Sequence, residues 1–324
     1  MSSSAAAAAA RRAKEAAILW VAGFREACCL HRVVFFCASS RTLLIRTGQC
    51  FLLNGLIFLG SLFTVKSVVI PIILRILPDQ CEQLEKLHLC DHKAIMTFYS
   101  FLRSILIEIF YILWFYPLYI FSFILSTLWY NDIAKHAFDV LKSNGLPTPR
   151  ELDDNNKLDS QERPGGLDGV ILGIGEQVYS VLLLTIFFIE VFVTGFIPYF
   201  GKAINFLLLT WMYAYYCFEY KWNFLGVSLN KRLDFFESNW AFFSGFGSPC
   251  VLPTFFFSPL VSYGVMAILY PLFVLTAAGT EAEDVIDSRR KSWGGEPEKI
   301  QIFYVARRFS TLVLQLFPGA QKEH

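Results

Sequence analysis

Four side chains that can bind a metal or form a disulfide lie close together in one polar stretch of the chain. They are Cys81, His88, Cys90 and His92. Cysteine and histidine are common zinc ligands, but zinc sites usually begin with a tightly spaced cysteine pair, which this stretch lacks. Cys81 and Cys90 could instead form a disulfide in an oxidising compartment. The stretch leaves three interpretations open: a metal site, a disulfide and no special role.

Ionisable residues also occur within or beside strongly apolar stretches. They are Glu108, Glu176, Glu190, Lys66 and Arg103. A charged group at the centre of a membrane helix costs about 2.5–3.5 kcal/mol on insertion scales, so it needs a partner or a function. Glu190 is the most central of them. It could belong to an ion pathway, or it could form one buried pair that only fixes helix packing.

No pattern in the chain predicts an enzyme. Gly169, Gly173 and Gly175 do not form a dinucleotide-binding loop, because no strand precedes them and an apolar helix follows. Close helix packing explains these glycines better. The sequence contains no nucleophile with a matching base, no phosphate-binding loop and no metalloprotease helix. We therefore expect a non-enzymatic protein with no cofactor and no bound metal.

The composition predicts the environment that must position these residues. Hydrophobic residues make up 55% of the 324 residues and charged residues 17%, whereas soluble chains carry about 25% charged residues. A soluble domain of this size would need more polar surface. The net charge of +1 gives no field that attracts nucleic acid, so no nucleic-acid partner is expected. We predict an all-α polytopic integral membrane protein. The lipid bilayer is then one of its partners.

Six apolar segments could cross or partly enter the bilayer as helices in hairpins, since one crossing needs about 20 apolar residues. The uncharged run 238–280 is about twice that length and must turn back, and Pro253 and Pro259 mark the turn. The third and fourth segments are so close that they must form a tight hairpin, which could dip into one leaflet. The segments are 48–76, 97–130, 170–199, 203–218, 241–256 and 260–278.

The charge distribution predicts the orientation and the division of the chain. Residues 1–47 carry an excess of Lys and Arg, whereas loop 79–96 is acidic. Because positive residues prefer the cytosolic side, we place both termini in the cytosol and loop 79–96 in the lumen. The chain then divides into a basic cytosolic region 1–47 with a disordered start, a helical membrane domain 48–278 with a flexible acidic loop 149–166, and a cytosolic tail 279–324.

The tail contains an amphipathic helix at about residues 297–317. Arg308, Thr311 and Gln315 lie on its polar face. A basic amphipathic helix suits the membrane surface, but it could equally pack on the protein's own cytosolic face. The apolar face, at helical spacing, contains Ile302, Val305, Ala306, Phe309, Leu312, Val313, Leu316 and Phe317.

A set of aromatic, charged and glycine-containing stretches stands out in the second half of the chain. It comprises Tyr216–Trp222, Lys231–Leu233, Asn239-Trp240, Gly245–Pro249 and Tyr270–Phe273. Together with Gln49-Cys50, Asn54-Gly55 and Leu128–Ala134, this set resembles the signature of the etoposide-induced protein 2.4 family. The resemblance covers most of 48–318 and is absent from 1–47 and 149–166. The family is more remotely similar to the bacterial CysZ-type sulfate permeases.

The resemblance implies a multi-pass protein of the endoplasmic-reticulum membrane with cytosolic termini, linked to autophagosome formation and degradation. Its partners would then be membrane or autophagy proteins, and a second copy of the chain could be one of them. The remote similarity to permeases implies an anion-conducting ancestry, so an anion (sulfate-like) permease or channel is the alternative. The resemblance to this family assigns no catalytic residue to this chain.

The residues of this signature also have a physical interpretation. Glu219 ends an apolar helix, Lys231, Arg232, Asp234 and Glu237 can pair along a cytosolic helix, and Trp240 anchors the return into the membrane. The glycines and proline after it loosen the next helix, where freed amides could hold an anion or the glycines could simply admit a neighbouring helix. We favour helix packing. The candidate residues are Glu190, Glu219, Arg232, Trp240, Gly245, Gly247 and Pro249.

The orientation predicts which cysteines a membrane-impermeant thiol reagent reaches in microsomes. Cys81 and Cys90 lie in the loop placed in the lumen, so after mild reduction they should react only once the membrane is permeabilised. Cys28 lies in the region placed in the cytosol, so it should react in sealed microsomes and serves as the control. Reaction of the loop cysteines in sealed microsomes would contradict the orientation.

Overall fold

The computed structural model describes residues 2–76, 93–143, 145, 167–291 and 299–315. The regular secondary structure of these residues is helical, and no strand occurs among them. The predicted all-α fold is therefore confirmed. Loop 149–166 and the four residues Cys81, His88, Cys90 and His92 lie outside the described part, so what the sequence predicts for them stays a prediction.

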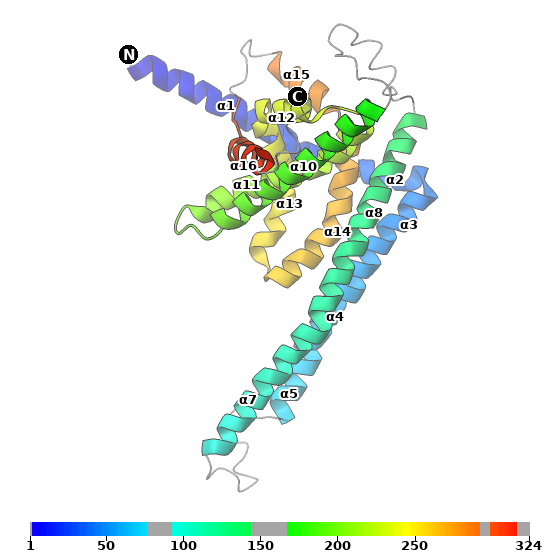
Figure 1. The fold of residues 1–324 in the computed structure, drawn as a ribbon, viewed down its shortest axis with the longest axis vertical. Coiled ribbons are helices and arrows are strands. Elements are labelled where there is room, and N and C mark those ends of the chain that lie inside the picture. Colours follow the sequence, from blue (N-terminus) through cyan, green and yellow to red (C-terminus); the bar gives the residue numbers. More distant parts are fainter. Residues whose placement is uncertain (1, 77–92, 144, 146–166, 292–298, 316–324) are drawn as a thin grey trace.

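Two long helical rods form a hairpin that projects from the rest of the molecule (Figure 1). Only 17% of the most apolar stretch of each rod is buried inside the protein, so the hairpin presents its apolar side chains outward, as expected of helices in lipid. The first rod comprises α3 (Arg41–Phe51), η1 (Leu52–Leu59), α4 (Gly60–Thr64), η2 (Val65–Val69) and α5 (Ile70–Ile76), where η marks π-helical turns. The second comprises α7 (Lys93–Phe110), η4 (Tyr111–Phe115) and α8 (Tyr116–Ser143).

A small polar network joins the two rods. Asn54 is fully buried in η1, and its amide nitrogen donates to Ser126 Oγ at 2.9 Å and to the carbonyl of Cys50 at 3.0 Å. Ser122 donates to the Asn54 side-chain oxygen. In a membrane, polar side chains that find each other across helices fix the pairing, because the alternative is an unsatisfied group in hydrocarbon. The network therefore sets the register of the hairpin.

The other apolar helices form a bundle beside the hairpin. They are α10 (Leu167–Thr194), α11 (Gly201–Phe224), α13 (Trp240–Phe256) and α14 (Pro259–Ala278). Among the described residues, three helices are long and apolar enough to cross a membrane, namely the two rods and α14, and 178–194 of α10 is a shorter apolar helix. The protein is thus an all-α membrane protein. The predicted turn in the run 238–280 is confirmed, because α13 ends at Phe256 and α14 begins at Pro259.

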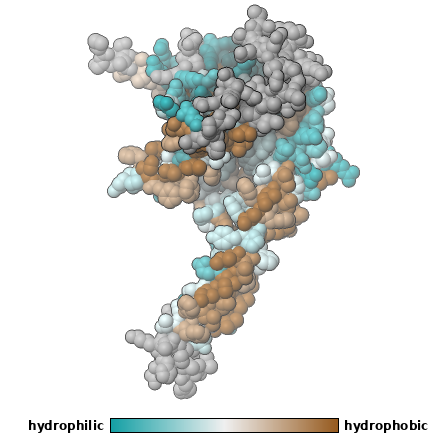
Figure 2. Space-filling view, viewed as in Figure 1, coloured by the Kyte–Doolittle hydropathy of each residue, from teal (hydrophilic) through white to brown (hydrophobic). Residues whose placement is uncertain are grey.

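Residues 2–39 are also helical and belong to the body of the protein. They form α1 (Ser2–Ala27) and α2 (His31–Ser39), and α1 packs along α13. The short helices α12 (Leu229–Ser238), α15 (Ala282–Arg290) and α16 (Tyr304–Gln315) lie near α1, at the opposite end of the molecule from the tip of the hairpin (Figure 1). Hydrophobic residues predominate on the projecting part of the hairpin, whereas hydrophilic ones gather toward the opposite end of the molecule (Figure 2).

The largest cluster of buried side chains lies where α11, α12 and α13 meet. It is rich in aromatic rings that meet edge to face or offset-stacked, the two geometries that aromatic pairs prefer. Phe243 illustrates this, with ring centroids 5.2 Å from Phe218 and 4.3 Å from Phe236, the second pair being stacked. The fully buried rings of the cluster include Tyr215, Phe218, Phe236, Phe242, Phe243, Phe246 and Phe303.

Replacement of Asn54 should loosen the hairpin. Asn54→Leu roughly keeps the size of the side chain but removes the hydrogen bonds to Ser122 and Ser126. We expect the free energy of unfolding to fall by about 1 kcal/mol, the usual scale of such bonds in membranes. The measurement is the thermal unfolding midpoint in detergent. Thr64→Val is the matched control, since Thr64 is exposed on the same rod and donates to Gly60 of its own helix. Equal midpoints for the two variants would contradict this role.

Candidate functional site

Six of the seven candidate residues lie on three consecutive helices. Glu219 is on α11, Arg232 is on α12, and the remaining four are on α13. These are Trp240, Gly245, Gly247 and Pro249. The structure therefore brings most of the signature to one place, around the aromatic cluster. Glu190 stands on α10, which packs mainly against α11 and α16.

Gly245 and Gly247 are sites where two other helices approach the backbone of α13. A Cβ on Gly245 would lie 1.9 Å from the carbonyl oxygen of Trp20 in α1, and one on Gly247 would lie 1.8 Å from that of Thr210 in α11. The contact with α1 is reciprocal, because a Cβ on Gly23 would lie 1.9 Å from the Phe242 carbonyl oxygen. This geometry supports the helix-packing interpretation, since neighbouring backbones occupy the space an anion would need.

Pro249 and Trp240 complete α13. Pro249 lies inside the helix and has no N–H to donate to the preceding turn, which weakens the backbone ladder there. Ser248 beside it donates to the carbonyl of Ser244 at 2.8 Å. Trp240 begins the helix, is half-buried against the aromatic cluster, and its carbonyl accepts a bond from the Trp211 indole at 3.0 Å. Trp240 thus joins α13 to α11, and its role as a membrane anchor stays a prediction.

Arg232 and Glu219 lie where α11 turns into α12. The Arg232 guanidinium donates to the Val227 carbonyl at 2.6 Å and to the Asn223 side-chain oxygen, so it holds the turn between these helices. Glu219 lies one residue beyond the predicted segment 203–218. Burial raises the pKa of Glu219 to about 7, and the nearby Arg232 offsets part of that rise. Glu219 can therefore change its charge near neutral pH.

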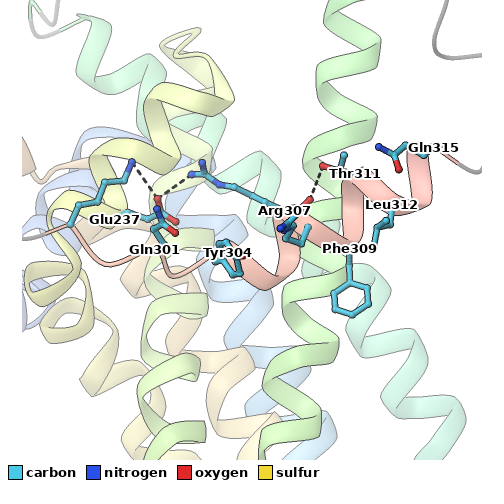
Figure 3. Close-up of a pocket in the computed structure, with 10 residues that line it drawn as sticks. Glu237, Gln301, Tyr304, Arg307, Phe309, Thr311, Leu312 and Gln315 are labelled. Carbon is cyan, nitrogen blue, oxygen red and sulfur yellow. Dashed lines mark hydrogen bonds and ion pairs between the residues drawn. The ribbon is translucent and has the colours of Figure 1, made fainter.

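Glu237 is a buried carboxylate whose partners lie in the C-terminal segment and not on its own helix. Its side chain is 2% exposed. One carboxylate oxygen accepts the backbone N–H of Phe303 at 3.1 Å. The other lies 3.5 Å from Nζ of Lys299 and 3.1 Å from Nη2 of Arg307, which Figure 3 shows beside it. This Glu237 anchor ties the C-terminal segment to α12. A buried carboxylate is stable there because each oxygen is paired.

The prediction that Asp234 and Glu237 pair with Lys231 or Arg232 of the same helix is wrong. Asp234 pairs with Lys299 at 2.6 Å rather than with a residue of its own helix, and this hydrogen bond raises the pKa of Lys299. Both acids thus bind residues more than sixty positions further along the chain. A signal was present in the sequence, since Glu237 shares one helical face with Leu229, Leu233 and Phe236, and an acid on an apolar face needs a buried partner.

Glu190 does not join the signature cluster. It is partly buried on α10, and its Oε2 atom is buried without a hydrogen-bond partner among the described residues. Glu108 lies on the hairpin, whereas α10 packs on α11 and α16. The side chain of Glu176 is outside the described part. Within that part, no group of three His, Cys, Asp or Glu side chains is arranged to hold a metal ion.

Comparison with known proteins identifies the family. The family model described as "Sulfate transporter CysZ/Etoposide-induced protein 2.4" matches residues 29–271, a range that contains every candidate residue. The chain belongs to this family. The match begins at residue 29, so the expectation that residues 1–47 lack the resemblance is wrong for 29–47. The acidic loop 149–166 also lies inside the matched range.

Three relatives illustrate the breadth of the family. The chain is 58% identical over 311 residues to the Protein EI24 homolog of Arabidopsis thaliana, covering 94% of this chain and 96% of the relative. It is 27% identical to the Protein EI24 homolog of Dictyostelium discoideum, covering 93% and 84%. It is 28% identical to the Caenorhabditis elegans Ectopic P granules protein 4, covering 50% and 46%. No solved structure matches the chain.

A side chain at Gly245 should separate α1 from α13. Gly245→Ala forces the Trp20 backbone away, and overpacking of this kind typically costs about 1–3 kcal/mol. We expect a lower thermal midpoint and faster tryptic cleavage within α1. Gly48→Ala is the matched control, because outside the backbone of its own helix and its two chain neighbours nothing lies within 4 Å of its Cβ position. In a helix, that change is neutral or slightly stabilising. Indistinguishable behaviour of the two variants would contradict the close contact.

Loss of the Glu237 charge should release the C-terminal segment. Hydrogen bonds to charged groups contribute about 1.5–3 kcal/mol. A loss of about 2 kcal/mol in Glu237→Gln corresponds to roughly 30-fold faster tryptic cleavage at Arg307 and Arg308, if cleavage follows local opening. Asp234→Asn is the control, since the Asp234 side chain is 58% exposed and such pairs contribute little. Equal cleavage rates would rule out the anchor.

Proposed function

We propose that the protein resides in the endoplasmic-reticulum membrane and supports autophagy, in autophagosome formation or degradation, through contacts with proteins or membranes and without catalysing a reaction. Membership of the family across residues 29–271 carries this proposal, because the resemblance to etoposide-induced protein 2.4 implies that location and role. The 58% identity to the Protein EI24 homolog of Arabidopsis thaliana extends the support over most of the chain.

The end of the molecule with the short helices is the part suited to such contacts. It holds α1, α12, α15 and α16, and hydrophilic residues gather around it (Figures 1 and 2). The Glu237 anchor keeps α16 in a fixed place on this end. A contact surface built from docked helices is better ordered than a free tail, so less conformational entropy is lost when a partner binds.

Deletion of the gene tests the autophagy proposal directly. We expect lower autophagic flux, measured as lysosomal turnover of an autophagosome marker, and restoration by the wild-type chain. Fractionation should place the tagged chain with endoplasmic-reticulum markers. Unchanged flux after deletion would overturn the autophagy role, and fractionation with another organelle would overturn the location.

An anion permease is the second proposal, and the family description, which names a sulfate transporter, favours it. The Gly245–Pro249 region gives it little support, because α1 and α11 fill the space around the glycines. Asn54, Ser122 and Ser126 do place hydrogen-bonding groups between two apolar rods. Sulfate uptake by liposomes that contain the purified protein decides the matter, and uptake no faster than in empty liposomes would end this proposal.

A further inference from the structure

Helix α16 has three different sides. One side is buried against the body, where Ala306 and Ser310 have no exposed surface and α16 packs on α10. A second side is polar and carries Arg308 and Thr311. The third side is apolar and exposed. It consists of Val305, Phe309 and Leu312, which are 40%, 54% and 54% exposed.

The two interpretations of this helix from the sequence are therefore compatible. Packing on the body uses one face and leaves the strip of Val305, Phe309 and Leu312 free. Phe309 points away from the Glu237 anchor, while Thr311 and Gln315 lie on the other side of the helix (Figure 3). An exposed apolar strip on a fixed helix needs an apolar medium or a partner to cover it.

The surroundings of the strip indicate lipid as its cover. Helix α10, on which α16 packs, exposes Val181, Phe188 and Phe192, each more than half exposed. Residues 178–194 of α10 form an apolar helix, so this surface belongs with the membrane-embedded part of the protein. Because α16 packs directly on that helix, its apolar strip lies on an element beside this surface, where lipid can cover it.

The positive charge of Arg308 beside the strip favours lipids with an anionic headgroup. A groove of about 660 Å³ between α12 and α16 is lined by Lys299, Arg307 and Arg308 against the single carboxylate of Glu237. Lys299 and Arg307 are engaged with Glu237 and Asp234. Arg308 is exposed, forms no ion pair with a described carboxylate, and lies 6.0 Å from the ring centre of Tyr304. A guanidinium in this position is suited to a phosphate oxygen.

We propose that α16 lies along the surface of the protein's own bilayer and binds anionic phospholipid. In this arrangement Val305, Phe309 and Leu312 enter the acyl-chain boundary, and Arg308 pairs with lipid phosphate at the headgroup level. The Glu237 anchor fixes the depth and rotation of the helix. The proposal specifies the membrane contact within the proposed function and rests on that part of it.

Photocrosslinking of the full-length protein in lipid nanodiscs tests the proposal. Benzoylphenylalanine replaces either Phe309 or Thr311, and lipid adducts are counted by mass spectrometry in discs of phosphatidylcholine with or without phosphatidylserine. We expect adducts at position 309 and few at position 311, with a higher yield at 309 in the anionic discs. Arg308→Gln should lower that yield about fivefold in anionic discs, the effect of one basic residue at such a surface, and leave it unchanged in neutral discs.

The outcomes separate this proposal from the autophagy role. Equal yields at positions 309 and 311, crosslinks at 309 to protein alone, or a yield at 309 that is the same in both lipids would each overturn the proposal. Thermal midpoints equal to that of the wild type show that the variants are folded, since all three positions are exposed. Autophagic flux is measured separately, so unchanged flux after gene deletion would overturn the autophagy role and leave the lipid result standing.

Discussion

The arrangement of the bundle depends on two close backbone contacts to α13. The backbone of α1 contacts Gly245, and the backbone of α11 contacts Gly247. Because the two glycines are two residues apart, they face nearly opposite sides of α13. Dispersion attraction rises steeply as backbones approach, and only glycine allows this approach. The contact with α1 is why residues well before the first apolar rod belong to the folded body. The aromatic cluster around Phe243 then fills the remaining space beside α11 and α12.

Basic residues stabilise helix ends at one end of the molecule. Lys221 donates to the Thr280 carbonyl at 2.7 Å, and Arg32 donates to the Thr280 hydroxyl at 2.6 Å, so both support the end of α14. Arg290 donates to the Ser238 carbonyl at 3.0 Å at the end of α12. Cations near helix C-termini are favourable because the last carbonyls lack partners inside the helix. Arg32, one of the positive residues of 1–47 from which the orientation is predicted, therefore also has a structural role.

The protein combines two kinds of apolar helix. The rods of the hairpin face outward along most of their length and are paired through the buried amide of Asn54, whereas 61% of the most apolar stretch of α14 is buried inside the protein. A lipid-facing rod needs only apolar side chains, but a buried helix also needs small residues and matched shapes. This difference explains why the glycine and proline signature lies in the bundle.

The sequence by itself determined the all-α membrane class, the turn between α13 and α14, and the amphipathic character of α16, because uncharged length and helical spacing are local properties. It also favoured close helix packing over an anion site at Gly245 and Gly247. Only the tertiary structure decided that α1 and α11 fill those positions and that Glu237 binds Arg307 and Phe303. Helical periodicity reveals which face of a helix is buried, but it contains no information about which distant segment covers that face. Partners separated by more than sixty residues are set by packing of the whole chain.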